Sequence, residues 1–168
     1  ILVDLGADRR LEDPADWDAF YGGTHYAPFT YAMPELPRLN GPSSRELIHK
    51  ATTLAAPGCN ATAITLALVA LVSRGIIAPD DVSAVLAVGS SGAGKAPRSD
   101  LMGSELQGSA NPYAVGGIHR HIPEIRQNLR TSTGHDLTLS MTPVLVPMSR
   151  GILATCSGLR VSSHSATD

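Results

Sequence analysis

Cysteine is scarce in this chain: only Cys59 and Cys156 occur among its 168 residues. Two cysteines are too few for the dense disulfide framework of a small secreted domain. A chain of this length buries roughly 70% of the surface that its unfolded form exposes, so its stability does not require disulfides. We therefore expect free thiols and a reducing, cytoplasmic environment.

Long apolar runs and blocks of like charge are also missing. The longest apolar run, 61–72, is interrupted by Thr62 and Thr65, and it is shorter than the roughly 20 apolar residues that span a bilayer. No signal-peptide pattern precedes it. The net charge is −2 and the charged residues are scattered, which disfavours a polyanion partner. We expect neither a membrane nor a nucleic acid as partner.

Aromatic residues make up only 4% of the chain, whereas 16 glycines and 12 prolines are present. Both of the latter counts lie somewhat above the usual shares of about 7% and 5%. This composition predicts many turns and is typical of enzymes with loops that expose their backbone. The chain opens on the apolar run ILVDLG without an initiator methionine, so we expect it to be a piece of a longer protein.

Strand-like and helix-like patterns interleave along the chain, which predicts an α/β or α+β fold. The predicted strands cover 1–5, 54–56, 82–88, 137–146 and 151–159. The first predicted helix begins at Pro14 with Asp13 as its cap, and the second begins at Ser43 or Ser44 with a capping box from Glu46. The third has Asn60 or Thr62 as its cap and stops at Gly75, and the fourth runs from Pro123 to residue 130. The remaining stretches 21–42, 89–94 and 103–117 are predicted to be irregular, and the tail 162–168 to be frayed.

Cys59 follows Pro57-Gly58 and directly precedes the apolar run, which places its thiol at the N-terminus of a predicted helix. Unpaired N–H groups and the helix dipole favour negative charge there, and the thiolate is the nucleophilic form of cysteine. The alternative is that Cys59 is a small buried hydrophobe. The residues alone leave both interpretations open, whereas Cys156, in an alternating apolar stretch, is most simply a core residue.

His119 and His121 lie two residues apart, just before Pro123-Glu124. Either ring can serve as a general base if it lies within hydrogen-bonding reach of a thiol. A solvated or structural cluster is the alternative. A zinc site built from both cysteines and both histidines is disfavoured, because no two cysteines have the close spacing of a zinc knuckle. We therefore expect no metal.

The segment Gly89–Gly94, followed by Lys95, is rich in glycine and follows a predicted strand. Glycines allow successive backbone N–H groups to converge on an anion such as phosphate. The spacing differs from that of a Walker A motif, and a plain turn is the alternative interpretation.

Taken together, six blocks of the sequence resemble the N-acetyl-γ-glutamyl-phosphate reductases of arginine biosynthesis, within the semialdehyde dehydrogenase group. The blocks are DLGADRRL at 4–11, FYGGTHYAPFTYAMPELPR at 20–38, PGCNATA at 57–63, VGSSGAGK at 88–95, GGIHRHIPEI at 116–125 and MTPVLVPMSRGILAT at 141–155. They keep the order and approximate spacing of that family. Their co-occurrence is specific, although each block alone is weak.

The resemblance implies roles for individual residues. It implies that Cys59 is the nucleophile, that His119 is the acid/base residue, and that Arg10 and Glu124 contribute to substrate binding or histidine orientation. It also implies that the loop Ser91, Gly92, Ala93 and Gly94 lies near the cofactor and the substrate phosphate. The sequence departs from the family at Asn60-Ala61, which often is Tyr-Pro, at Arg9, which often is Phe, and at Ala32, which often is Gly.

The resemblance further implies that 1–56 are the end of a Rossmann-type NADP-binding domain with a connecting loop. Residues 57–168 would then be most of a mixed-sheet catalytic and dimerisation domain. The Gly-rich dinucleotide fingerprint is not among the 168 residues. The implied activity is NADPH-dependent reduction of N-acetyl-γ-glutamyl phosphate through a cysteine thioester, by a homo-oligomer when full length. Two alternatives remain: a related reductase acting on aminoadipyl or aspartyl phosphate, and an inert packing or dimerisation fragment.

Overall fold

The computed structural model describes residues 1–94 and 99–161 and contains two separate β-sheets. The first is a small parallel sheet in the order β1-β3-β2, formed by β1 (Leu2–Asp4), β2 (Thr30–Tyr31) and β3 (Thr53–Ala55). Helices α1 (Pro14–Phe20) and α2 (Ser44–Lys50) lie in the connections between its strands. Lys95 and the tail 162–168 lie outside the described residues.

The second sheet is mixed, with the order β5-β6-β4-β7. It consists of β4 (Val82–Gly89), β5 (Asn111–Pro112), β6 (Leu139–Val146) and β7 (Ile152–Ser157). Strands β4 and β6 are parallel, whereas β7 and β5 run antiparallel to their neighbours. The mixture of helices with parallel and antiparallel strands confirms the predicted α/β class.

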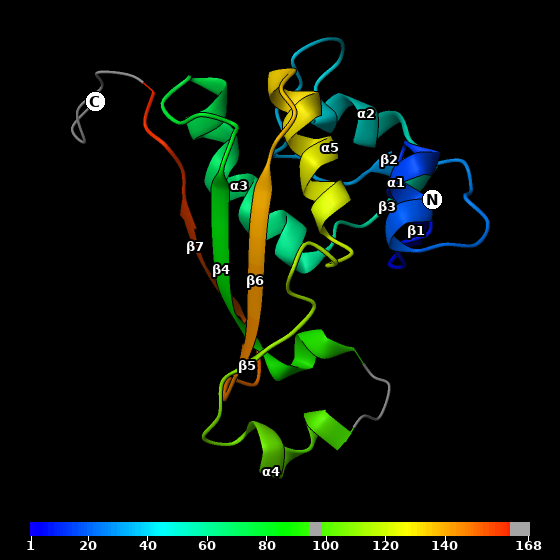
Figure 1. Ribbon diagram of the computed structural model, residues 1–168. Coiled ribbons are helices and arrows are strands. Elements are labelled where there is room, and N and C mark those ends of the chain that lie inside the picture. The colour runs from blue at the N-terminus through cyan, green and yellow to red at the C-terminus, as the bar shows by residue number, and fades with distance from the viewer. Residues whose placement is uncertain (95–98, 162–168) are drawn as a thin grey trace.

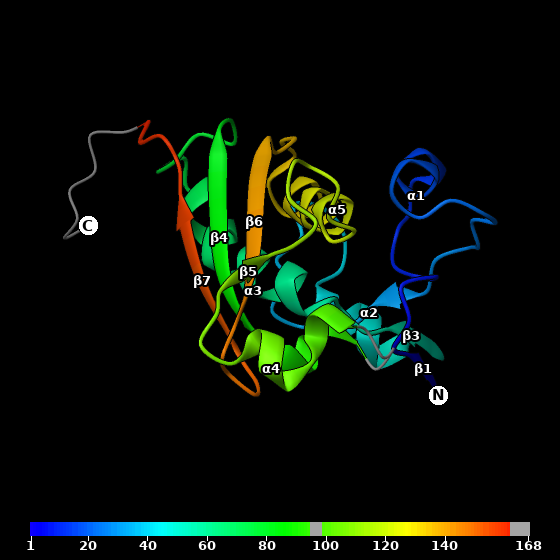
Figure 2. The ribbon, with the colours of Figure 1, turned by 60° about the horizontal axis from the view of Figure 1, so that its bottom comes forward.

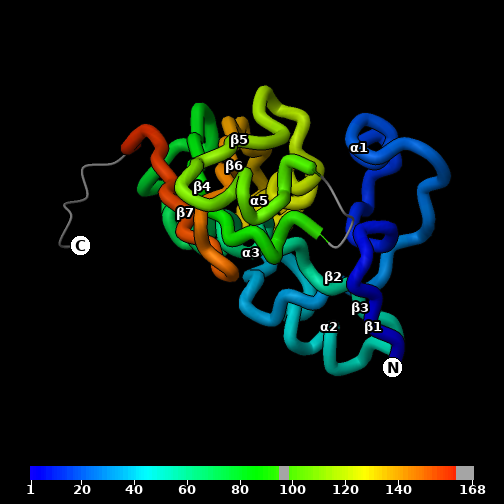
Figure 3. The backbone as a smooth tube through the Cα atoms, turned by 90° about the horizontal axis from the view of Figure 1, so that it is seen from below, coloured from blue at the N-terminus to red at the C-terminus, as the bar shows by residue number. Residues whose placement is uncertain are grey.

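Two long helices, α3 (Cys59–Ser73) and α5 (Ile122–Thr133), pack against one face of the mixed sheet. In Figures 1 and 2, α5 lies between this sheet and helix α1, and Figure 3 shows β7 on the side of the sheet away from the N-terminal segments. The shared core includes Ile64 and Leu68 of α3, Ile125 of α5 and Leu86 of β4, each of them almost completely buried. Burying one such side chain contributes about 1.5–3 kcal/mol, so this core holds the two helices on the sheet.

Several local predictions are confirmed. The side chain of Asp13 caps α1, the reciprocal capping box of Ser43 and Glu46 starts α2, and Gly75 follows α3 with a φ of 63°. That left-handed conformation is one that glycine adopts without steric cost, which explains the helix stop.

Other predictions need correction. Helix α5 is longer than expected, because it begins at Ile122 and continues to Thr133. The stretch 103–117, predicted to be irregular, contains the short helix α4 (Gly103–Leu106) as well as β5, and 21–42 contains β2. These elements are too short to show a periodic pattern in the sequence. Within the described ranges, no helix is both long and apolar enough to cross a membrane.

Candidate active site

Cys59 is the first residue of α3, so its thiol lies at the N-terminal end of that helix. The predicted position of Cys59 is therefore confirmed, and the thiol is exposed. The predicted caps are wrong: Gly58 occupies the cap position, where no side chain pairs with the first N–H groups. Such N–H groups, together with the helix dipole, favour negative charge beside Cys59.

The buried carboxylate of Glu124 holds the turn that precedes Cys59. Its Oε1 accepts the backbone N–H of Gly58 at 2.7 Å and the hydroxyl of Tyr31 at 2.7 Å. Its Oε2 accepts a longer bond of 3.4 Å from Nη1 of Arg10, which is also buried. Because its partners come from three separate parts of the chain, Glu124 ties α5 to the start of α3.

Gly58 is required where the turn meets these side chains. A Cβ atom at this position would lie 2.6 Å from Nε2 of His121 and 2.8 Å from Oε2 of Glu124. Only glycine allows so close an approach without displacing one of them. The Pro57-Gly58 turn thus brings His121 and Glu124 directly against the residue before Cys59.

His119 is linked to α3 through Asn60. Its Nε2 lies 3.4 Å from Nδ2 of Asn60, and its Nδ1 accepts the backbone N–H of His121 at 3.0 Å. Burial, and then the neighbouring His121, lower the pKa of His119 from 6.5 to about 4, against an opposing effect of Glu124. The ring is therefore neutral at pH 7. Because Nδ1 accepts a hydrogen bond, the single ring proton resides on Nε2.

His121 packs edge to face against His119, with ring centroids 4.9 Å apart. Burial and then the positive charge of Arg10 lower the pKa of His121 to about 4, so this ring is neutral as well. Its buried Nδ1 has no hydrogen-bond partner among the described residues. The two neutral rings form one wall of a cavity that reaches Cys59.

This cavity, of about 420 Å³, unites segments that are far apart in the sequence. Its lining residues come from the start of α3, the glycine loop and the segment before α5: Cys59, Asn60, Gly92, Ala93, Gly94, Tyr113, Ala114, Ile118, His119, Arg120 and His121. The structure therefore brings the predicted nucleophile, the predicted acid/base residue and most of the predicted cofactor loop to one place.

A second cavity, of about 410 Å³, adjoins the same cysteine. It is lined by Cys59, Thr62, Ala63, Val88, Gly89, Ser91, Gly92, Gly151 and Ile152. Cys59 and Gly92 thus line both cavities, so the sulfur is accessible from two sides. A group that reacts with Cys59 and a group that delivers a second reactant can therefore occupy separate spaces.

The glycine loop forms the 3₁₀ turn η1 (Ser90–Ala93) at the end of β4. The backbone N–H groups of Ser90 and Ser91 donate to the carbonyls of Met148 and Ser149. These two N–H groups are therefore not available to bind an anion. Gly92, Ala93 and Gly94 line the cavity with His119, and the anion cradle expected of this loop remains a prediction.

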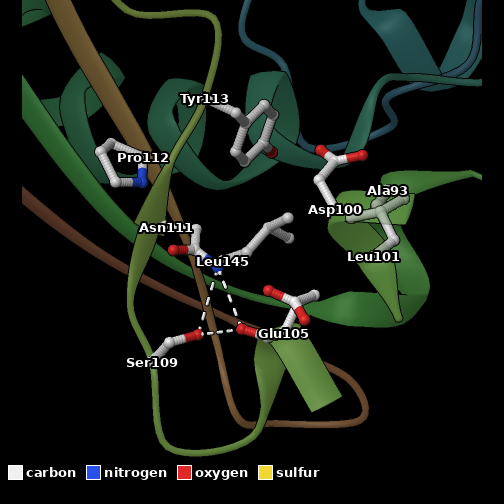
Figure 4. A pocket seen from close by; sticks show the side chains of 9 residues that line it. All are labelled: Ala93, Asp100, Leu101, Glu105, Ser109, Asn111, Pro112, Tyr113 and Leu145. Carbon is white, nitrogen blue, oxygen red and sulfur yellow. Dashed lines mark hydrogen bonds between the residues drawn. The ribbon is translucent and has the colours of Figure 1, made fainter. Parts of the chain in front are cut away.

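A further cavity, of about 400 Å³, lies on the other side of Tyr113 (Figure 4). Asp100 and Glu105 contribute to its lining, and Asn111 donates to Oγ of Ser109 at 3.2 Å and to the Glu105 carbonyl at 3.5 Å. Two carboxylates disfavour an anionic ligand. Cys59 does not line this cavity, which makes it a poorer candidate site than the two cavities at the sulfur.

Arg10 and Glu124 line neither of the two cavities at Cys59. Besides its contact with Glu124, Arg10 donates through Nη2 to the carbonyl of Leu5. Both side chains therefore act on the site by holding the turn before Cys59. Their predicted contribution to substrate binding or histidine orientation remains a prediction.

Sequence reasoning missed two residues of the site. Asn60, considered as a helix cap and as a departure from the family motif but not as a site residue, is 1% exposed and lies between Cys59 and His119. Its position directly after the cysteine was the available signal. Tyr113 lies 3.4 Å from Asn60 and stacks at a tilt on His119, with centroids 5.7 Å apart. No sequence pattern marked Tyr113, because it follows a strand of only two residues.

Among the described residues, no group of three or more His, Cys, Asp or Glu side chains is arranged to hold a metal ion. Cys156 lies on β7, half-buried against the core. Burial raises the pKa of the Cys156 thiol. The two cysteines therefore occupy chemically different environments.

A family model described as "Semialdehyde dehydrogenase, dimerisation domain" matches residues 59–167. This match covers more than half of the chain and begins at Cys59. The chain belongs to the semialdehyde dehydrogenase family.

Curated relatives confirm the resemblance to N-acetyl-γ-glutamyl-phosphate reductases. The protein of that name from Leifsonia xyli is 56% identical over 155 residues, which are 92% of this chain and 44% of the relative. Those from Acidothermus cellulolyticus and Mycobacterium avium are 50% and 47% identical, covering 94% and 99% of this chain and 44% and 46% of the relatives. The chain thus spans less than half the length of the curated relatives that it matches.

Proposed function

We propose that this chain carries the catalytic cysteine of an N-acetyl-γ-glutamyl-phosphate reductase, an enzyme of arginine biosynthesis. The observation that supports this proposal is the cavity in which Cys59, at the start of α3, meets His119 and the glycine loop. The names of relatives about 50% identical to the chain favour the acetylglutamyl substrate over aminoadipyl or aspartyl phosphate. The predicted cytoplasmic location remains an expectation.

Cys59 is the nucleophile in this proposal. As thiolate, its sulfur attacks the γ-carbonyl carbon of the acyl phosphate, the C–O bond to phosphate breaks, and a thioester remains on Cys59. The proton that the thiol gives up ends on the departing phosphate. After the thioester is reduced, the C–S bond breaks, the semialdehyde leaves and the thiolate is restored.

His119 serves this reaction as a proton donor at Nε2. Since its Nδ1 accepts the N–H of His121 and burial keeps the ring neutral, the one ring proton is on Nε2. Nε2 lies 3.4 Å from the Asn60 amide, a long contact, and the ring lines the cavity, so a substrate oxygen can share or take over this proton. A neutral imidazole can stabilise the oxyanion that forms twice at the former carbonyl oxygen. Of the two roles expected for His119, the geometry therefore supports that of proton donor better than that of proton acceptor.

The cavity on the Thr62 side of Cys59 fits the nicotinamide end of NADP(H). Its wall contains Gly89, Gly92 and Gly151, which have no side chains and so leave room for a flat ring beside Cys59. The cofactor, when bound, supplies the hydride that reduces the thioester. Ser91–Gly94 are proposed to lie near it, whereas the 168 residues contain no Gly-rich fingerprint for its pyrophosphate.

We also propose that the full-length protein is a homo-oligomer that associates through the mixed sheet. The face of this sheet opposite α3 and α5 exposes Val85 on β4 and Leu153 on β7, at 51% and 67%. Exposed apolar residues on one face typically mark an interface. The description of the matching family model as a dimerisation domain supports a second copy as the occupant.

The test compares turnover of N-acetyl-γ-glutamyl phosphate with NADPH by the complete coding sequence, by its Cys59→Ser variant and by the 168-residue chain. We expect the complete protein to be active, the variant to lose at least about a thousand-fold in kcat, and the 168-residue chain to be inactive. Aspartyl and aminoadipyl phosphate serve as competing substrates. Unchanged turnover by Cys59→Ser contradicts the proposed nucleophile, and preference for a competing substrate contradicts the proposed specificity.

A further inference from the structure

Asn60 lies at a point where two hydrogen-bond donors face each other. Its Nδ2 is 3.4 Å from Nε2 of His119, and the fixed backbone N–H of His121 donates to Nδ1 of the same ring. A neutral imidazole carries one proton, which must then be on Nε2. Nε2–H therefore points at an NH₂ group, which also donates. The backbone N–H of His121 can only donate, so the proton stays on Nε2. The group that must change from donor to acceptor is therefore the amide of Asn60.

Exchanging the amide oxygen and nitrogen of Asn60 removes this conflict. The two atoms have nearly the same size, so the surrounding donors and acceptors decide which is which. In the exchanged orientation, Oδ1 accepts Nε2–H of His119. Nδ2 then occupies the position 4.0 Å from Sγ of Cys59, where it donates an N–H to the sulfur.

Tyr113 is compatible with the exchanged orientation. Its hydroxyl lies 3.4 Å from the amide atom of Asn60 that faces His119. A phenol hydroxyl can accept from an NH₂ group or donate to an oxygen, so His119 decides the orientation. With an oxygen at that position, both Nε2–H of His119 and the hydroxyl of Tyr113 can donate to it.

We propose that Asn60 is a positioning residue whose amide N–H points at the Cys59 sulfur, held there by donors from His119 and Tyr113. The inference rests on the proposed function for its catalytic meaning, but not for its geometry. Asn60 is 1% exposed, so water does not compete for its amide. It therefore adds a hydrogen bond to the thiolate and couples the orientation of His119 to the nucleophile.

The first test is nitrogen NMR of the histidine rings in the unsubstituted chain, which needs no variant to fold. At pH 7 we expect the ring of His119 to carry its proton on Nε2. A ring protonated on Nδ1 overturns the proposal, because Asn60 could then donate to Nε2 and its oxygen would face the sulfur.

The second test is the rate at which iodoacetamide alkylates Cys59 as a function of pH, in a Cys156→Ser background that leaves one thiol. Replacing Asn60 by leucine is expected to move the midpoint of this profile upward by about one pH unit, the loss of one hydrogen bond to a charged sulfur. Asn60→Asp is expected to move it further, because a carboxylate repels the thiolate. An Asn60→Leu midpoint equal to that of the parent overturns the proposal.

Thr65→Val is the matched control. Thr65 is also buried on α3 and accepts a hydrogen bond from Asn128, but it lines neither cavity at Cys59. Its replacement is expected to leave the midpoint unchanged, and an equal shift in this variant would mean that any disturbance of α3 suffices. Neither test uses substrate or cofactor. Absence of reductase turnover in the complete protein therefore counts against the proposed function alone. An unchanged alkylation profile in Asn60→Leu counts against the proposed role of Asn60 alone.

Discussion

The start of α3 buries polar side chains, whereas the face of the mixed sheet opposite α3 and α5, called the open face below, exposes apolar ones. Around Cys59, the polar side chains of Asn60, His119 and Glu124 are buried at 1%, 7% and 1% exposure. On the open face, Val85 and Leu153 are apolar and exposed at 51% and 67%. Buried polar groups and exposed apolar groups are the observations that carry information about function. The first region is the one that we propose for catalysis, and the second is the one that we propose for contact with a second copy.

The comparison also shows how differently the two regions are held together. Glu124 has partners from three separate segments, and each loses its hydrogen bond if the carboxylate is removed. On the open face, the hydroxyls of Ser83 and Ser157 are 2.8 Å apart and exposed, so water can replace either one. Substitutions in the two regions are therefore expected to have very different effects on stability.

Glu124→Ala is expected to have the largest effect, because it leaves the N–H of Gly58 and the guanidinium of Arg10 buried without their partner. Breaking a buried ion pair in this way typically costs about 3–5 kcal/mol. Chemical denaturation of the parent and the variant measures this cost. The matched control is Ser157→Ala, for which we expect a change within about 0.5 kcal/mol. Equal destabilisation by the two substitutions would remove the contrast between the regions.

The pH dependence of the free energy of unfolding tests the buried region around Cys59 a second time, through its two buried histidines. The pKa values of His119 and His121 lie near 4 in the folded chain and near 6.5 in the unfolded chain. Between these values the unfolded state binds more protons, so stability is present above pH 6.5 and is lost as the pH falls towards 4. The slope is at most about 1.4 kcal/mol per pH unit for each ring.

Chemical denaturation at several pH values measures this slope. The double variant His119→Asn, His121→Asn is expected to give a flatter profile over the same range. A profile as steep as that of the parent would show that other groups cause the loss of stability.

Leu153→Asp on the open face is expected to have the smallest effect on folding and a clear effect on association. Because Leu153 is exposed, its replacement changes the free energy of unfolding of the monomer by no more than about 0.5 kcal/mol. Light scattering of the complete protein should nevertheless show dissociation, since a buried unpaired charge is costly in an interface. Leu39→Asp is the control, an exposed leucine outside the sheet, and should leave the oligomer intact. An intact oligomer in Leu153→Asp would exclude this face as the interface.

Local chemistry made several features of this chain predictable. Alternating apolar residues marked β4, and the capping residues Asp13, Ser43 and Glu46 marked the starts of α1 and α2. The Pro57-Gly58 turn before an apolar run placed Cys59 at a helix N-terminus. Each of these signals lies within a few residues of what it specifies, so it can be read along the chain.

The division of the chain at residue 56 remains a prediction. The short elements β2, β5 and α4 were not predictable, because two to four residues show no period. The two strands, moreover, form only by pairing with distant segments.

By itself, the sequence determined the class of the fold, the family and the location of one thiol at the start of a helix, because these depend on local patterns and on motif order. Only the tertiary structure decided which groups surround that thiol. Asn60 meets Tyr113 across 53 residues of chain and His119 across 59, and Glu124 reaches Gly58 across 66. Such contacts arise from the packing of α3 against α5 in a shared core, which no local pattern specifies.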